Sequence, residues 1–139
     1  MLFRSANGKA LFTKTCATCH TLFGEGNKVG PELTGADRKN LDFLLTSTVD
    51  PSAYIRPEFV AWVVNLKDGR SLTGLVAESS PQAITLLNEK NERTVIARDK
   101  IDEMSASAVS LMPEKILDPL SEQEIRDLFA YLQSDGPPK

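Results

Sequence analysis

The 139-residue chain contains only two cysteines and one histidine, and it has no long apolar run. Crossing a bilayer as a helix takes about 20 consecutive apolar residues, so we expect no segment here to span a membrane. The net charge of −3 and the lack of a Lys/Arg cluster interleaved with aromatic residues argue against nucleic acid as a partner. What is present is an ordinary globular composition, 41% hydrophobic and 25% charged. A chain of this length can bury a core without disulfides.

The two cysteines and the histidine fall in one five-residue window, Cys16-Ala17-Thr18-Cys19-His20. Random ordering of this composition would produce that motif only about once in ten thousand arrangements, so accident is a poor explanation. Two thiols roughly one helical turn apart can each bond one vinyl group on a haem edge. The adjacent imidazole then faces the iron from the same segment. The sequence therefore predicts one covalently attached haem c, bound through Cys16, Cys19 and His20.

Three other uses of these residues are weaker interpretations. A disulfide between Cys16 and Cys19 would close a very short loop, would gain little stability and would leave His20 unexplained. A zinc site needs a fourth ligand, and the chain has no further Cys or His. A thioredoxin-like redox pair belongs to a βαβ unit, whereas this motif follows a helical segment.

The sixth ligand of the iron has to come from another residue type, because His20 is the only histidine. Methionine is the next candidate, and the chain contains Met1, Met104 and Met112. Met1 is a start residue, and Met104 follows a strand-like run, which favours a role in filling the core. Met112 precedes a proline that fixes the local backbone, so we predict it as the second axial ligand. Five-coordinate iron with an open sixth position is the alternative.

Helical patterns lie near both ends of the chain and in one short segment between them. The spacing of apolar residues predicts a helix over 5–15 and another over roughly 40–48. A capping box that begins at Ser121 starts the last helix. Because the glycine at Gly8 permits close approach, we expect the first and last helices to cross there.

From residue 59 the pattern changes from helical to strand-like. Branched and aromatic residues dominate 59–66, and the Asp-Gly pair that follows is typical of a tight hairpin. Further strand patterns cover 71–78, 83–87, 93–97 and 100–104. We therefore predict a mainly α fold, a cytochrome c-like helical haem domain with an inserted small antiparallel β-sheet or barrel. Residues 1–58 and 103–139 would form the haem domain and 59–102 the insertion.

The motif, the Gly-Pro-x-Leu-x-Gly loop at 30–35, the Leu-Met-Pro segment and the apolar last helix together resemble monohaem cytochrome c domains. More narrowly, 49–55, 66–74 and 112–117 resemble the planctomycete-type haem-binding domain. That domain usually forms the C-terminal module of large exported proteins. The resemblance, together with a linker-like C-terminus, implies a domain of a longer chain in a periplasmic or otherwise extracytoplasmic location.

The resemblance also implies roles for two residues of the glycine-rich loop. The carbonyl of Pro31 would accept from the ring N–H of His20, and Leu33 would line the haem pocket. Ligation by His and Met leaves no open site on the iron and gives a relatively high potential. We therefore expect an electron carrier and not an enzyme, with redox partners such as a dehydrogenase donor and a respiratory acceptor, fused or docked. The alternative is a haem-based ligand sensor with an open or labile sixth position.

Overall fold

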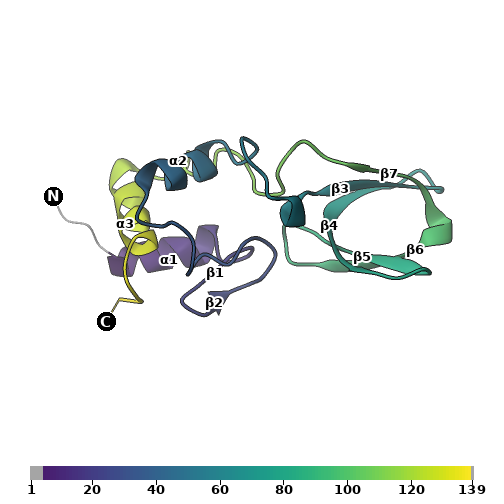
Figure 1. Cartoon of the computed structure of the whole chain (residues 1–139). Coiled ribbons are helices and arrows are strands. Elements are labelled where there is room, and N and C mark those ends of the chain that lie inside the picture. Colours follow the sequence, from purple (N-terminus) through teal and green to yellow (C-terminus); the bar gives the residue numbers. More distant parts are fainter. Residues whose placement is uncertain (1–4, 139) are drawn as a thin grey trace.

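Figure 1 shows the computed structural model of the chain, which describes residues 5–138. The helices gather at one end of the molecule and an antiparallel sheet forms the other end. Met1, one of the three methionines, lies outside the described residues. Within them, the α-helices are α1 (Ser5–Thr15), α2 (Leu41–Val49) and α3 (Glu122–Leu132). None of these described helices is long and apolar enough to cross a membrane.

α1 and α3 cross in close contact because Gly8 has no side chain. A Cβ atom at Gly8 would lie 1.9 Å from the backbone oxygen of Asp127 and 2.8 Å from Cβ of Tyr131. The Asp127 carboxylate is buried in this crossing and accepts hydrogen bonds from Asn7 at 2.7 Å and from Gln123 at 2.8 Å. The predicted crossing of the terminal helices at Gly8 is therefore confirmed.

Side-chain caps begin both α2 and α3, and the cap of α3 at Ser121 is the one that the sequence predicts. Asn40 accepts from the backbone N–H of Phe43 at the start of α2. Ser121 accepts from the N–H of Glu124, whose carboxylate accepts from the N–H of Ser121, which completes the capping box of α3. These bonds satisfy backbone donors that have no partner inside the helix.

Arg38 joins the loop before α2 to the end of α3. Its Nη1 atom donates to the carbonyls of Leu132 and Ser134, both at 2.7 Å. Its guanidinium lies 5.0 Å from the centre of the Phe23 ring. A cation that binds the free carbonyls at a helix C-terminus is favoured by both hydrogen bonding and the helix dipole. The buried core beside it comprises Leu11, Phe12, Leu22, Leu44, Leu128, Phe129, Tyr131 and Leu132.

The other end of the molecule is a five-stranded antiparallel sheet in the order β6-β5-β4-β3-β7. A separate short hairpin follows the Cys-x-x-Cys-His motif, in a segment for which no strand is predicted. The strands are β1 (Thr21–Leu22), β2 (Glu25–Gly26), β3 (Trp62–Leu66), β4 (Ser71–Ser79), β5 (Ala83–Leu87), β6 (Arg93–Ala97) and β7 (Ile101–Ala106).

The sheet folds over on itself because β4 serves two partners. Its first part pairs with β3 up to Gly74, and its second part pairs with β5 from Leu75 onward. A Cβ atom at Gly74 would lie 2.7 Å from the backbone oxygen of Leu87, so glycine is needed where the chain bends. Figure 1 shows β4 curving between the two layers. Between the two layers lies a buried cluster, and Met104 packs against it. Its members are Val64, Leu66, Ile84, Leu86 and Ile96.

The prediction of a mainly α chain is wrong, because helix makes up 28% of the structure and strand about 25%. The sheet is a packed unit with a core of its own, as strands need when an isolated hairpin is only marginally stable. β7 also continues to Ala106, past the predicted limit of the insertion at residue 102. At the other limit, Pro57–Phe59 forms a 3₁₀ turn, and the strand predicted from residue 59 begins at Trp62.

Candidate functional site

The Cys-x-x-Cys-His motif lies in a helix-like turn directly after α1. The N–H of Cys16 donates to the Phe12 carbonyl at 2.8 Å, and the N–H of His20 donates to the Cys16 carbonyl at 2.9 Å. Both thiols are free. Among residues 5–138, no group of three or more His, Cys, Asp and Glu side chains is placed to hold a metal ion.

His20 is oriented by a hydrogen bond to the glycine-rich loop. Its Nδ1 atom lies 2.8 Å from the carbonyl oxygen of Pro31, which is the contact that the resemblance implies. A carbonyl can only accept, so Nδ1 carries the proton and Nε2 of the neutral ring keeps its lone pair. Burial lowers the pKa of His20, and the hydrogen bond to Pro31 opposes that shift. The neutral imidazole is the form that binds iron.

Two glycines make room for His20. A Cβ atom at Gly30 would lie 2.9 Å from Cε1 of the His20 ring, and the Gly30 N–H donates to the Cys19 carbonyl at 2.6 Å. Gly26 has a positive φ of 114°, and a Cβ atom there would lie 2.0 Å from the His20 carbonyl oxygen. Gly30 lies in the glycine-rich loop that the sequence predicts near the site. The role of Gly26 depends on the β1–β2 hairpin, for which the sequence carries no strand pattern.

The two thiols lie in surroundings that keep them protonated. Burial raises the pKa of Cys16 to about 12, with a smaller contribution from Cys19. Burial also raises the pKa of Cys19, and the charge of Glu89 adds to that shift. Both shifts favour the thiol over the thiolate, which is the more reactive form.

Leu33 and Met112, the other predicted haem-pocket residues, both lie on loops and are half-buried. Leu33 packs against the helical core. Met112 lies between β7 and α3, where its N–H donates to the Ser110 hydroxyl at 3.1 Å. The preceding Leu111 packs against the same apolar cluster as Cys19. The structure thus brings the Met112 loop and the motif to one cluster, and the roles of Leu33 and Met112 toward iron stay predictions.

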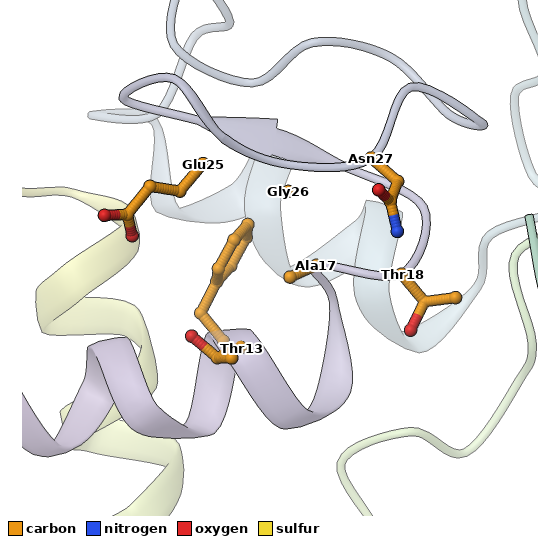
Figure 2. Close-up of a pocket in the computed structure, with 7 residues that line it drawn as sticks. Thr13, Ala17, Thr18, Glu25, Gly26 and Asn27 are labelled. Atoms are coloured by element: carbon orange, nitrogen blue, oxygen red, sulfur yellow. The ribbon is translucent and has the colours of Figure 1, made fainter.

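A shallow pocket opens beside the motif, as Figure 2 shows. Ala17 and Thr18, the two residues between the cysteines, form part of its wall. None of the predicted haem-binding residues lines it, so we assign no haem to this pocket. Its full lining is Phe12, Thr13, Ala17, Thr18, Glu25, Gly26 and Asn27.

A hydrogen bond to the motif comes from the five-stranded sheet. The Cys19 thiol donates to the carbonyl oxygen of Glu89 at 3.1 Å, across 70 residues of sequence. No sequence pattern marks this contact, because the acceptor is a backbone carbonyl, which every residue has.

Comparison with known proteins agrees with the geometry. The profile of the family described as Cytochrome c matches residues 5–135. Two curated relatives, the proteins named cytochrome c from Cochliobolus lunatus and Arabidopsis thaliana, are each 66% identical to this chain over 29 residues. The match covers 20% of this chain and 27% and 26% of those relatives, so it spans about a quarter of their length. The chain belongs to the cytochrome c family, whose members bind haem c covalently and transfer electrons.

Proposed function

We propose that this chain is an electron carrier in which Cys16 and Cys19 attach one haem c and His20 and Met112 are the axial ligands. The observation that carries the proposal is the orientation of His20, whose Nδ1 donates to Pro31 at 2.8 Å. The hydrogen bond leaves Nε2 available to the iron. A hydrogen bond from the second ring nitrogen fixes a ligating histidine and raises its basicity.

The placement of the methionines supports Met112 as the second ligand. Met104 lies on β7 and packs against the core of the sheet. Met112 instead lies on a loop that is anchored to the segment after α2. The Ser52 hydroxyl of that segment accepts from the N–H of Ser110 at 3.0 Å. Iron with two protein ligands has no site for a substrate, which favours electron transfer over catalysis or ligand sensing.

The visible spectrum of the haem-loaded protein tests this ligation with a matched pair of variants. A methionine sulfur on ferric haem gives a weak far-red band, and Met→Leu removes the sulfur at nearly constant volume. We expect the band in the parent protein and in Met104→Leu, and its loss in Met112→Leu. A parent protein that lacks the band and binds CO freely when reduced would overturn the proposal and favour a haem-based ligand sensor.

We also propose that the chain works outside the cytoplasm, as a module that serves a dehydrogenase or a respiratory chain. Residues 1–58 and 103–139 would bind the haem, and 59–102 would be an insertion. The Cys-x-x-Cys-His motif supports the location, because haem is attached to it by extracytoplasmic machinery, and so does the resemblance to planctomycete-type domains. Cell fractionation with haem staining tests it. Haem-stained protein in the cytoplasmic fraction alone would contradict this location.

A further inference from the structure

The turn between β5 and β6, residues 88–92, lies against the haem-attachment motif. The end of the sheet that carries this turn faces the helices (Figure 1). The carbonyl of Glu89 accepts from the Cys19 thiol at 3.1 Å. The insertion therefore reaches the sulfur atom that would bond the haem.

The 88–92 turn is held in shape by its own hydrogen bonds. The side-chain oxygen of Asn88 accepts from the backbone N–H groups of Lys90 and Glu92, both at 2.9 Å. The N–H of Asn88 donates to the Glu92 carbonyl at 3.0 Å. Asn91 has a positive φ of 62°, which asparagine tolerates in turns. These bonds do not involve the Cys19 thiol, so the turn keeps its shape when that thiol has become a thioether.

Apolar packing holds the base of the turn against the motif. Leu87, directly before the turn, is 5% exposed and forms a buried cluster with Val29 and Leu75. Cys19 and Leu111 pack against that cluster. The cluster joins the motif, the insertion and the Met112 loop. Packing therefore holds the turn on the site independently of the thiol hydrogen bond, which is lost when Cys19 becomes a thioether.

We propose that the 88–92 turn covers the edge of the haem at Cys19 and sets how far water and small redox reagents reach it. This inference rests on the proposed function in one respect, that haem is attached at Cys19. Ferric haem carries one more positive charge than ferrous haem, so water at the haem edge favours the ferric form. A cover that excludes water therefore raises the reduction potential and slows electron exchange with small reagents.

A shortened turn provides the test. Leu87 and Arg93 are direct cross-strand partners, and a two-residue Asn-Gly turn in place of 88–92 shortens the connection between them by three residues. In the haem-loaded protein we expect the equilibrium constant for reduction to fall about tenfold, which for one electron is about 59 mV. We also expect faster oxidation of the ferrous protein by both ferricyanide and tris(phenanthroline)cobalt(III).

The two oxidants separate loss of cover from change of charge. The shortened turn lacks Glu89, Lys90 and Glu92, so it removes one net negative charge. Charge alone would speed the anionic oxidant and slow the cationic one. The control Glu89→Gln changes charge within an intact turn, and we expect it to move the two rates in opposite directions. Faster reaction with both oxidants in the shortened variant therefore supports loss of cover.

An unchanged potential with unchanged rates in the haem-loaded shortened variant would overturn the inference, as would faster reaction with ferricyanide alone. If the shortened variant does not fold, Asn88→Ala decides, because it loosens the turn at constant length and charge. We expect this variant to lower the reduction potential and to speed oxidation by both reagents, each by less than the shortened turn does. No change in the potential or in the rates would overturn the inference. A parent protein whose intact mass shows no attached haem would instead refute the proposed function.

Discussion

Replacement of Gly8 by alanine should destabilise the protein, although alanine is the better helix former. In a helix interior with free space, Gly→Ala gains about 1 kcal/mol. At Gly8 the new Cβ atom would lie 1.9 Å from the Asp127 carbonyl oxygen and 2.7 Å from its carbon. Both are backbone atoms of α3 and cannot rotate away, so the two helices have to separate. Overpacking costs typically about 1–3 kcal/mol, and the upper end of that range applies where backbone meets backbone.

We predict a net loss of about 2 kcal/mol in the free energy of unfolding for Gly8→Ala, which at this chain length lowers Tm by roughly 6–8 °C. Thermal unfolding of the haem-loaded protein, followed by far-ultraviolet circular dichroism, measures it. Gly35→Ala is the matched control, because a Cβ atom there meets nothing within 4 Å, and its Tm should match the parent's. A Gly8→Ala protein as stable as the parent would show that the helices do not cross at this distance.

Three further substitutions test other contacts. Tyr131→Phe should keep or raise the free energy of unfolding by up to about 1 kcal/mol, because the buried hydroxyl has no hydrogen-bond partner among the described residues; a clear loss in denaturant unfolding would reveal a partner. Arg38→Met should cost about 2 kcal/mol in the same assay, because two 2.7 Å bonds to the end of α3 are lost, and an unchanged midpoint would contradict this. Gly30→Ala should press on the His20 ring and produce high-spin ferric haem in the visible and electron paramagnetic resonance spectra, while unaltered spectra would show that the ring has room to adjust.

Local signals in the sequence were sufficient for the helices, for two of the strands and for the chemistry of the motif. The helix predicted over 5–15 matches α1, and the strands predicted over 83–87 and 93–97 match β5 and β6. The capping box at Ser121 is also present. Each of these features depends on residues within a few positions of one another, so propensity, capping and periodicity determine them.

The β1–β2 hairpin shows what such signals miss. Phe23 and Gly24 both have positive φ at its turn, and phenylalanine rarely adopts that conformation. Distant contacts hold Phe23 there: its N–H donates to the Thr34 hydroxyl at 2.8 Å, and its ring lies edge-on to that of Tyr131. No local pattern predicts a conformation that depends on contacts from the opposite end of the chain.

The sequence by itself predicted that Cys16, Cys19 and His20 form a haem-attachment motif, because the spacing of two thiols and an imidazole is a local property, and the cytochrome c family to which the chain belongs agrees with that prediction. Only the tertiary structure showed that strand is nearly as abundant as helix, and that a turn of the sheet reaches Cys19. That contact uses a backbone carbonyl 70 residues away. Its position depends on how β4 bends at Gly74 and how the sheet packs on the motif, and neither is encoded near Glu89.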